Sequence, residues 1–437
     1  MSTYNELRKK IREKDAVITV VGLGYVGLPI ALEFCKKGFT VNGFDTNAQR
    51  IKKLKDKKSY INDITSKEMR KILTKGSFLA TTNDKVLASS DVIIICVPTP
   101  LRKIKDPDIS FIIRASRTLS LRMRPGQLIV VESTTYPGTT RDIILPELNK
   151  SGCELDKDFY LAFSPERIDP GNKKYGFSNI PKVIGGLTEK STKLGELLYK
   201  RVVKKVVGVS KAEVAEVTKL LENTFRIVNI GLINEFAILC DKLDIDVWEV
   251  IKAASTKPFG FMPFYPGPGI GGHCIPADPM YLSWKARTVG FKTEMIDLAA
   301  DINRMIPSHV VRRAGKLLRK QGKGLKDARI LIVGVTYKKD VNDLRESPAL
   351  DIIEGLRKKK SRLTYHDPYI PYLDLPGIKI KSRKLTAELL KKQDLVLIAT
   401  DHSDLDYKKI VRNSKLIFDT RNILNKKKIK ADNIVKL

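Results

Sequence analysis

The sequence has 437 residues, which is enough for two or three domains that each bury a core. Hydrophobic residues make up 42% and charged residues 30% of the chain, as in ordinary globular proteins, but 80 basic against 49 acidic residues give a formal net charge of +31. No apolar run approaches the roughly 18 residues of a membrane-spanning helix, and residues 1–14 are too polar for a signal peptide. We therefore expect a cytoplasmic protein without membrane insertion.

The positive charge is spread along the chain and not concentrated in one region. Only short basic runs occur, such as residues 357–360, and none is interleaved with aromatic residues. This pattern favours a solvated surface that steers acidic small molecules, and it predicts no nucleic-acid partner. The five cysteines, at positions 35, 96, 153, 240 and 274, are scattered and odd in number, so we expect neither a disulfide framework nor a metal site.

Residues 15–45 have the pattern strand, turn, helix and strand. An apolar run over 17–21 is followed at once by the turn Gly22-Leu-Gly24-Tyr25-Val26-Gly27, then by a helical pattern and a strand that ends at Asp45. In this context the three glycines permit a dinucleotide pyrophosphate to approach the N-terminus of the helix. Asp45 would bind the adenosine ribose diol and repel a 2′-phosphate, so the predicted cofactor is NAD and not NADP.

Four further strands are predicted over residues 91–97, 128–133, 159–163 and 183–184. The runs that follow the first three contain small or polar residues. Ligands of an open α/β sheet bind outside the carboxyl ends of its strands. Thr99, Thr134 and Glu166 are therefore expected to line the cofactor crevice.

Residues 212–240 are predicted to form one long helix. Apolar residues recur along it at steps of three and four: Val214, Val217, Leu221, Phe225, Val228, Leu232, Phe236 and Leu239. Lys219, Asn223 and Arg226 fall at i, i+4 and i+7 on another face, and apolar neighbours flank them. Polar groups on a largely buried helix usually have partners. Helical patterns also cover 247–254 and about 292–320, so the middle of the chain is predicted to be all-helical.

The loop over residues 259–282 carries the sharpest chemical signal. Four glycines and three prolines lie between Pro266 and Pro276, a density that excludes helix and strand. The loop presents Cys274, with Asp278 four residues later, and such a setting favours a reactive thiol over a structural one. Apolar residues at its start are expected to bury one rim: Phe259, Phe261, Phe264 and Tyr265.

After a hinge at 321–327 the alternation of strand, turn and helix begins again, with strands predicted over 328–335, 363–365, 395–399 and 416–418. The first turn lacks the glycine fingerprint but is basic and hydroxyl-bearing, which suits a second phosphate-containing ligand. The predicted fold is α/β: two Rossmann-like doubly wound domains, over 1–205 and 321–437, joined by a central all-helical segment over 206–320.

A thiolate, a lysine and NAD together indicate oxidation beyond an aldehyde. The thiolate of Cys274 can add to an aldehyde, and the adduct can lose a hydride to become a thioester that water hydrolyses to a carboxylate. Lys219 would stabilise the oxyanions that develop. Asp278 and Glu166 are candidate bases, and Asn223 is a candidate for positioning water or an oxyanion.

Seven segments together resemble the nucleotide-sugar 6-dehydrogenases, the UDP-glucose/GDP-mannose dehydrogenase family, over essentially the whole chain. They are residues 22–29, 96–100, 132–139, 164–172, 219–235, 267–282 and 343–348. The chain looks closest to the UDP-N-acetylglucosamine 6-dehydrogenase branch, because residues 164–167, 169–172 and 271–276 are similar to those of enzymes acting on N-acetylhexosamines. One position departs from the pattern: Lys257-Pro258 stand where many relatives carry an arginine that reaches across the dimer.

The resemblance implies a reaction, a set of site residues and an oligomeric state. The reaction is the NAD-dependent four-electron oxidation of the C6 hydroxyl of a UDP-sugar to the uronic acid, in a homodimer or higher homo-oligomer. Cys274 would be the nucleophile and Lys219 the acid/base group, with Asp278, Thr134, Glu166 and Asn223 assisting. NAD would be bound by Gly22, Gly24, Tyr25, Val26, Gly27, Asp45, Arg50, Thr99, Thr134 and Arg345. The sugar nucleotide would be bound by Arg167, Ile168, Lys219, Asn223, Arg226, Gly269, Tyr337 and Lys338.

Several alternatives stay open on the sequence. UDP-N-acetylmannosamine and UDP-glucose are rival substrates to the favoured UDP-N-acetylglucosamine. A one-step hydroxyacid dehydrogenase would also pair a Rossmann domain with a helical domain, but it would leave Cys274 and the C-terminal domain without a role. A protein that senses NAD or binds nucleic acid would use the charge of +31 and show no turnover.

Overall fold

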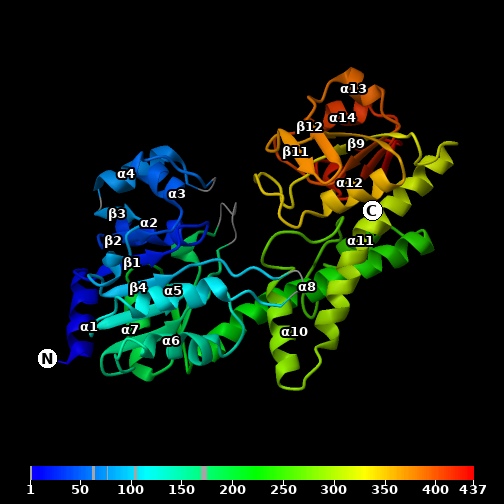
Figure 1. The fold of residues 1–437 in the computed structure, drawn as a ribbon. Coiled ribbons are helices and arrows are strands. Elements are labelled where there is room, and N and C mark those ends of the chain that lie inside the picture. Colours follow the sequence, from blue (N-terminus) through cyan, green and yellow to red (C-terminus); the bar gives the residue numbers. More distant parts are fainter. Residues whose placement is uncertain (1, 62–63, 76, 103–105, 169–174) are drawn as a thin grey trace. The chain divides into compact units, whose positions relative to one another are not determined.

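The computed structural model describes residues 2–61, 64–75, 77–102, 106–168 and 175–437 (Figure 1). Segment 169–172, which carries part of the likeness to enzymes acting on N-acetylhexosamines, lies outside the described residues. The chain divides into two compact units. The first comprises residues 1–222 and 280–292, and the second comprises residues 223–279 and 293–437.

The first unit is built on an eight-stranded sheet with the order β3-β2-β1-β4-β5-β6-β7-β8. The first six strands in this order are parallel, and β7 and β8 run antiparallel to them. Its strands are β1 (Val17–Val21), β2 (Thr40–Phe44), β3 (Phe78–Thr81), β4 (Val92–Ile95), β5 (Gln127–Val131), β6 (Phe159–Phe163), β7 (Lys182–Gly186) and β8 (Val206–Val209). The strand order reverses between β1 and β4, the point where such sheets bind dinucleotides.

Helices cover both faces of this sheet, because its central strands are apolar on both sides. One face packs against α1 (Thr3–Glu13), α2 (Gly27–Lys36), α3 (Ala48–Lys55), α4 (Ser66–Lys75) and α7 (Glu189–Tyr199). The other face packs against η1 (Asp84–Leu87), α5 (Ser110–Ser120), η2 (Thr140–Ile144), α6 (Leu145–Asn149) and the start of α8 (Ala212–Leu243). A short turn, η3 (Phe177–Asn179), precedes β7.

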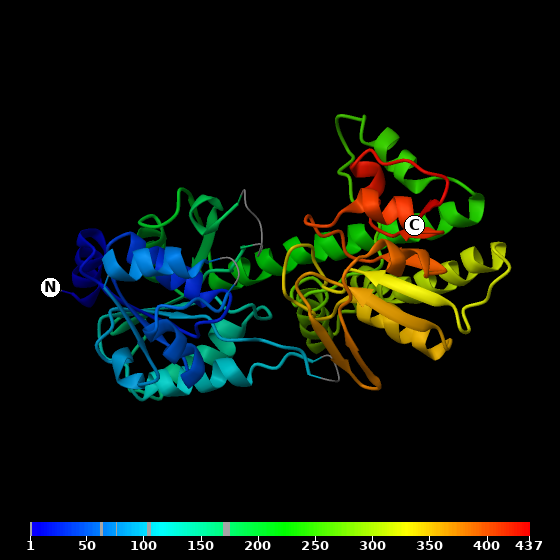
Figure 2. The ribbon, with the colours of Figure 1, turned by 90° about the horizontal axis from the view of Figure 1, so that it is seen from above.

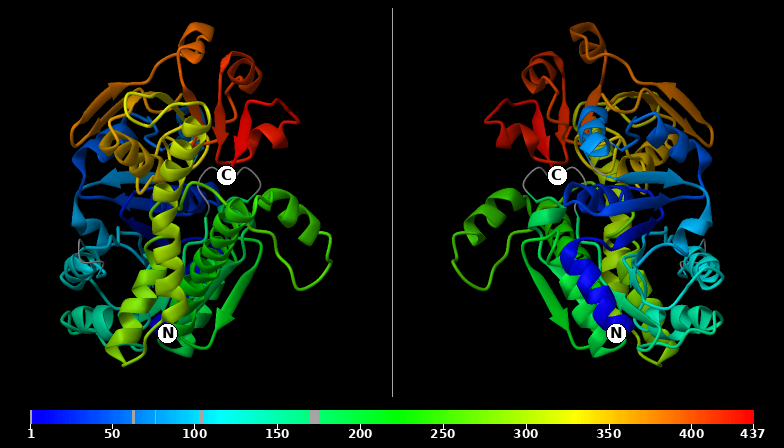
Figure 3. Two further views of the ribbon diagram at one scale, coloured as in Figure 1. Left: turned by 90° about the vertical axis from the view of Figure 1, so that its right-hand side faces the viewer. Right: turned by 90° about the vertical axis from the view of Figure 1, so that its left-hand side faces the viewer.

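Long helices occupy the middle of the chain, as predicted: α8, α9 (Val247–Ala254), α10 (Asp278–Thr288) and α11 (Glu294–Lys320). Within the second unit α8 and α11 lie side by side (Figure 3). They approach closely because position 231 is a glycine, where an added Cβ would stand 3.3 Å from the Cα of Ala299. One feature differs from the expected all-helical segment. Strand β8 begins at Val206 and pairs with β7, in a run too short for its periodicity to be recognised.

The second unit contains a five-stranded parallel sheet with the order β10-β9-β13-β14-β15 (Figure 2). Its strands are β9 (Arg329–Val333), β10 (Arg362–His366), β13 (Leu395–Ile398), β14 (Ile417–Asp419) and β15 (Ile434–Lys436), and a hairpin is formed by β11 (Tyr372–Leu375) and β12 (Ile378–Lys381). On one face lie α11 and α12 (Pro348–Lys358). On the other lie α13 (Ala387–Lys391), α14 (Tyr407–Asn413) and α15 (Ile423–Lys426). The strand order reverses between β9 and β13, so this sheet is also doubly wound.

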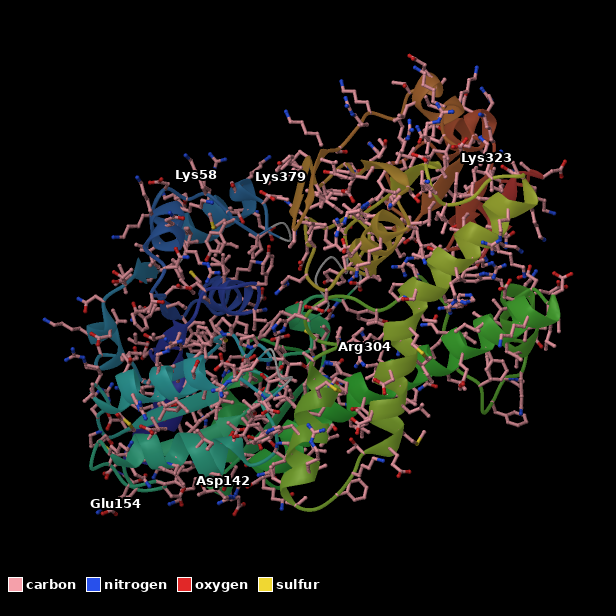
Figure 4. All side chains as sticks on the ribbon, turned by 45° about the vertical axis from the view of Figure 1, so that its right-hand side comes forward. Lys58, Asp142, Glu154, Arg304, Lys323 and Lys379 are labelled. Atoms are coloured by element: carbon pink, nitrogen blue, oxygen red, sulfur yellow. The ribbon has the colours of Figure 1, made fainter. Side chains whose placement is uncertain are left out.

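The two sheets and the helical middle confirm the predicted fold class. In the part of the chain that the structure describes, no helix is both long enough and apolar enough to span a membrane. Charged side chains lie on widely separated parts of the chain, among them Lys58, Lys323 and Lys379 (Figure 4). This distribution agrees with the dispersed positive charge of the sequence.

Candidate active site

The glycine turn after β1 has the geometry that a dinucleotide requires. Gly22 has φ +90°, and a Cβ there would lie 2.6 Å from the carbonyl oxygen of Cys96, so a side chain is excluded. A Cβ at Gly27 would stand 1.9 Å from the carbonyl oxygen of Gly22, so a glycine is needed for α2 to begin this close to the turn. At Gly24 an added Cβ would meet nothing within 4 Å. That opening, at the N-terminus of α2 and beside the exposed Tyr25, is a cradle for a pyrophosphate.

Asp45 lies at the end of β2, and the turn holds its carboxylate in place. Its Oδ2 accepts the N–H of Leu23 at 2.8 Å, and its Oδ1 accepts the N–H of Asn47 at 2.8 Å. The guanidinium of Arg50 donates to Oδ2 at 3.2 Å. The residues of this turn therefore fit NAD: a backbone cradle for the pyrophosphate, and an oriented carboxylate for the ribose diol.

Thr99 and Thr134 follow β4 and β5, and other elements of the first unit hold their loops. The hydroxyl of Tyr281 on α10 donates to the carbonyl of Thr99 at 2.7 Å. After Thr134, the buried carboxylate of Glu216 on α8 accepts the N–H of Gly138 at 2.6 Å and the N–H of Thr140 at 2.9 Å. Both loops at the carboxyl edge of the sheet are thus fixed by helices that come later in the chain.

Glu166 follows β6 and is buried, with partners on both carboxylate oxygens. Oε1 accepts the N–H groups of Arg167 at 2.6 Å and Ile168 at 2.5 Å, while Oε2 lies 3.2 Å from the Nζ of Lys182. Burial alone would raise the pKa of Glu166, but the charge of Lys182 and the N–H of Ile168 hold it below its usual range. The carboxylate is therefore ionised and oriented.

The side chain of Arg167 extends from this turn to α8, where it pairs with Glu222 at 2.6 Å. Ile168 beside it is half-buried. Lys219, one turn before Glu222 on the same helix, is also half-buried. The first unit thus contains the predicted dinucleotide residues except Arg345, together with Glu166, Arg167, Ile168 and Lys219.

In the second unit the loop over residues 259–279, named the nucleophile loop after the role predicted for Cys274, presents that residue at the surface. The carbonyl of Cys274 accepts the N–H of Asp278 at 2.8 Å, and α10 begins at that residue. The carboxylate Oδ2 of Asp278 accepts the side-chain amide of Asn223 on α8 at 2.5 Å. Burial, and then the charge of Arg345, lower the pKa of His273, so the imidazole next to Cys274 is neutral at pH 7. The structure therefore brings Cys274, Asp278 and Asn223 together.

The glycines of the nucleophile loop allow it to pack directly on the loop that follows β9. A Cβ at Gly272, where φ is +86°, would stand 2.7 Å from the ring of Tyr337. The N–H of Gly272 donates to the carbonyl of Arg345 at 3.0 Å. Gly269 packs on Pro348, to whose Cβ an added Cβ would come within 2.8 Å. Close approach of the two backbones thus accounts for the glycine-rich sequence.

Tyr337 and Lys338 lie at the switch point of the second sheet, on a loop held by His402. The ring Nδ1 of His402 accepts the N–H of Asp340 at 3.0 Å, and Nε2 donates to Asp367 at 3.0 Å. Further along the loop, the Nη2 of Arg345 pairs with Asp343 at 2.6 Å. Arg226, on α8, is exposed. The second unit thus contains the remaining predicted substrate residues.

Sequence reasoning missed several polar groups at these edges. Arg421 follows β14, and a Cβ at Gly267 would stand 2.9 Å from its guanidinium, beside the nucleophile loop. Burial lowers the pKa of Arg421. Lys182 and Glu132 flank Glu166 and were also missed. Glu132 and Arg421 lie just after the ends of β5 and β14, and this position is the signal that could have identified them. Lys182 stands at the start of a strand and carries no such signal.

The aromatic rim of the nucleophile loop differs from expectation. Phe259, Phe261 and Tyr265 were predicted to be buried, but they are exposed in the single chain. Phe264 is half-buried and makes an edge-on contact with Phe225 at 5.7 Å between ring centroids, and the exposed Tyr265 stacks on Trp248 at 6.1 Å. Aromatic composition alone predicts burial without telling what covers the rings.

A dinucleotide turn in one unit and a cysteine loop packed on a second doubly wound sheet in the other define a nicotinamide-dependent dehydrogenase. The protein-family comparison makes this specific. The NAD binding, central and UDP binding domains of the UDP-glucose/GDP-mannose dehydrogenase family match residues 16–203, 213–305 and 331–426. The chain belongs to this family. The predicted cofactor, NAD, and the predicted enzyme class, an NAD-dependent UDP-sugar dehydrogenase, are confirmed.

Relatives cover nearly the whole chain. Protein CapL of Staphylococcus aureus is 39% identical over 93% of this chain and 96% of its own length. A UDP-N-acetyl-D-glucosamine 6-dehydrogenase of Pseudomonas aeruginosa is 39% identical over 82% of this chain and 84% of its own. The solved structure of a UDP-D-ManNAc dehydrogenase of Pyrococcus horikoshii has a TM-score of 0.86 at 34% identity, covering 96% of this chain and 98% of that one.

Proposed function

We propose that the protein oxidises the C6 hydroxyl of a UDP-N-acetylhexosamine, with UDP-N-acetylglucosamine as the favoured substrate, to the uronic acid. The observation that carries this proposal is the exposed Cys274 on a loop whose Asp278 is held by Asn223 at 2.5 Å, in a chain with NAD and UDP binding domains. A one-step dehydrogenation would need no such thiol. The reaction would consume two NAD for each sugar.

Each oxidation removes a hydride and a proton from the substrate. NAD, when bound, accepts the hydride in both steps. Lys219 would take the C6 hydroxyl proton in the first step, and its ammonium form would stabilise the oxyanions that follow. The thiolate of Cys274 would add to the aldehyde carbon to give a thiohemiacetal, which becomes a thioester when the second hydride and proton leave. Water then breaks the carbon–sulfur bond, and the carboxylate and the thiol are released.

Hydrolysis needs an oriented water. We assign that task to Asp278 with Asn223, and to Thr134. Glu166 would assist as a fixed anion, since two backbone N–H groups and Lys182 occupy its oxygens. In this role Glu166 would stay ionised and would not act as a general base.

The nucleotide diphosphate would be bound by cationic and backbone groups. The proposed contacts are Arg167, Ile168, Arg226, Gly269, Tyr337 and Lys338, with Arg345 reaching NAD or the sugar nucleotide and Arg421 as a further cation. Guanidinium groups suit phosphates because they donate two hydrogen bonds in one plane.

The acetamido sugar is favoured by the relatives. The Pseudomonas aeruginosa enzyme named for the gluco epimer is 39% identical. The manno epimer is the second candidate, because the Pyrococcus horikoshii structure named for it has a TM-score of 0.86. The two substrates differ only in the configuration at C2, so a pocket can separate them by only a few kcal/mol.

Initial rates decide between these substrates. Purified protein is given NAD and equal concentrations of UDP-N-acetylglucosamine, UDP-N-acetylmannosamine and UDP-glucose. We expect the gluco N-acetyl sugar to be oxidised fastest. Faster oxidation of the manno epimer would replace the favoured substrate with the second candidate, and faster oxidation of UDP-glucose would refute the N-acetyl assignment.

A further inference from the structure

A buried ionic cluster lies in the first unit beside the turn that carries Arg167 and Ile168. Lys182, the first residue of β7, is 4% exposed, and its Nζ lies 2.5 Å from Oε2 of Glu132 and 3.2 Å from Oε2 of Glu166. Glu132 directly follows β5 and is 1% exposed. Its second oxygen, Oε1, accepts the hydroxyl of Tyr199 from the end of α7. The cluster thus joins the ends of β5, β6 and α7 to the start of β7.

Stability alone is a weak reason for such a cluster. Taking charges out of water is costly, and well-packed apolar residues in place of a buried ion pair are often neutral or stabilising. The aromatic rings of Phe177 and Tyr199 already stand 5.3 and 5.2 Å from the ammonium, so an apolar residue would have partners here. The arrangement therefore points to a task that needs the charge.

The contacts of Glu166 indicate what that task is. One of its oxygens is bound to Lys182, and the other accepts the consecutive N–H groups of Arg167 and Ile168. The carboxylate thus links the backbone N–H groups of this turn to the ammonium of Lys182. From that turn the guanidinium of Arg167 reaches Glu222 on α8.

Within the cluster, the pKa values of the two carboxyl groups are shifted in opposite directions. Burial raises the pKa of Glu132 to about 7, although Lys182 opposes the shift. The pKa of Glu166 is held low instead, by Lys182 and the N–H of Ile168 against the effect of burial. Cys96 and Tyr199 also face the cluster, and burial raises the pKa of both, so neither adds a charge at pH 7. A proton taken up by the cluster therefore goes to Glu132 and leaves Glu166 ionised.

We propose that Lys182, held by Glu132 and Tyr199, is a positioning residue for sugar-nucleotide binding: it fixes the Glu166 carboxylate, which sets the conformation of Arg167 and Ile168. The inference rests on the proposed function, in which Arg167 and Ile168 contact the substrate. The dinucleotide turn after β1 takes no part in these hydrogen bonds, so we expect the loss of Lys182 to affect sugar-nucleotide binding more than NAD binding.

The test compares Lys182→Met, which keeps the length of the side chain without its charge, with Lys182→Arg, which keeps the charge. Lys200→Met is the matched control. Lys200 caps the C-terminus of α7 directly after Tyr199, but its side chain is exposed and pairs on the surface with Glu196 at 2.8 Å. For each variant, calorimetry gives the Kd of UDP-N-acetylglucosamine, fluorescence gives the Kd of NADH, and kcat/KM for the sugar is followed from pH 5 to pH 9.

We expect Lys182→Met to weaken sugar-nucleotide binding on the order of tenfold, as a misplaced binding group does, with the Kd of NADH unchanged within twofold. Without the ammonium, Glu166 should bind a proton more readily, so the acidic limb of the pH profile should move up by about one unit. Lys182→Arg should recover most of the affinity, and Lys200→Met should match the wild type.

Three outcomes overturn the inference. They are wild-type affinity and pH profile in Lys182→Met, an equal loss of NADH and sugar binding without a pH shift, and failure of Lys182→Arg to recover any affinity. If Lys182→Met does not fold, the double variant Lys182→Met/Glu132→Gln removes both charges of the pair and is judged by the same measurements. If the wild type neither binds nor oxidises any UDP-sugar, the proposed function fails too, whereas a functional wild type with an unaffected variant refutes only the role of Lys182.

Discussion

Asp45 and Asp367 occupy equivalent positions after the second strand of their sheets, yet they have different surroundings. Each accepts an N–H from the turn after the first strand, Leu23 to Asp45 at 2.8 Å and Val335 to Asp367 at 2.7 Å. The remaining acceptor positions of Asp367 bind His402 and the N–H groups of Tyr369 and Ile370. Those of Asp45 face Asn47 and a half-exposed Arg50. We therefore predict that the acid of the first sheet, and not that of the second, binds a ribose.

The position of Asp45 predicts a preference for NAD over NADP of at least tenfold in kcat/KM. A fixed carboxylate repels a 2′-phosphate, and a tenfold preference requires only about 1.4 kcal/mol. The guanidinium of Arg50 lies 3.2 Å from the carboxylate and offsets part of this repulsion. Without the negative charge of Asp45, that guanidinium would be left to attract the 2′-phosphate. Asp45→Asn should narrow the preference. Equal rates of the wild type with the two cofactors would contradict this account of Asp45.

The buried Glu132 predicts a pH dependence of stability. Burial raises its pKa from 4.5 to about 7, so between these values the folded state binds more protons than the unfolded state. The free energy of unfolding should therefore fall as pH rises from about 4.5 to about 7, by ~3 kcal/mol at most from this group. Urea midpoints measured from pH 5 to pH 8 should fall less steeply in Glu132→Gln than in the wild type.

The exposed Glu249→Gln on α9 serves as the control for this measurement, and it should keep the wild-type slope. Parallel curves for Glu132→Gln and the wild type would show that Glu132 does not carry the buried proton.

At the scale of elements, α8 has two faces with different tasks. Its buried face contains Asn223, whose side-chain amide donates to Asp278. It also contains Asn234, whose side-chain Oδ1 accepts the N–H of Gly267 at 3.1 Å. Asn234 in turn donates to Asn303 on α11 at 2.9 Å, and Asn303 donates to two backbone carbonyls. This amide chain connects two helices to the start of the nucleophile loop, so loop geometry depends on how α8 and α11 pack.

Asn303→Ala should destabilise the second unit by about 1–3 kcal/mol, because it leaves the buried amide of Asn234 without its acceptor. Trp248 reports on this unit, since its indole N–H donates to the carbonyl of Leu437 at 3.1 Å. In a Trp284→Phe background, its fluorescence in a urea titration measures the change. Asn229→Ala, at a half-buried site of α8 where the side chain contacts only the backbone of its own helix, should change the free energy of unfolding by less than about 0.5 kcal/mol. Equal shifts in the two variants would contradict a structural role for the amide chain.

At the scale of the whole molecule, much of the fold and part of the site could be predicted. Strands such as β1 and β6 are nearly continuous apolar runs, and their boundaries agree with the sequence pattern. Edge elements were missed, namely β3, β8, β15 and the β11–β12 hairpin, because three or four half-exposed residues have no clear period. Lys182 was missed for a related reason: a charged residue beginning a strand is indistinguishable in sequence from a solvated one. The assignment of roles to individual site residues stays a prediction.

The exposed apolar stripe of α8 predicts self-association. Leu221, Phe225, Leu232, Phe236 and Leu239 are 45–61% exposed in the single chain, and Phe259 and Met262 of the nucleophile loop are exposed as well. Apolar residues in such number on one helix are typical of an interface with a second copy. We expect a homodimer or larger homo-oligomer by sedimentation, and Phe225→Asp/Leu232→Asp should dissociate it. A monomeric wild type at micromolar concentration would refute this expectation. Asp244→Ala, at an exposed position, is the control and should leave the assembly unchanged.

The central claim is that one active site carries out two successive oxidations, the second through a thioester on Cys274. The most direct measurement is the number of NADH molecules formed for each UDP-N-acetylglucosamine consumed, in the wild type and in Cys274→Ser. We predict two NADH and the uronic acid for the wild type. For the variant we predict no more than one NADH and almost no acid, because a serine hydroxyl without a dedicated base is a poor nucleophile. One NADH for each sugar in the wild type, or acid formation by Cys274→Ser at the native rate, would contradict the account.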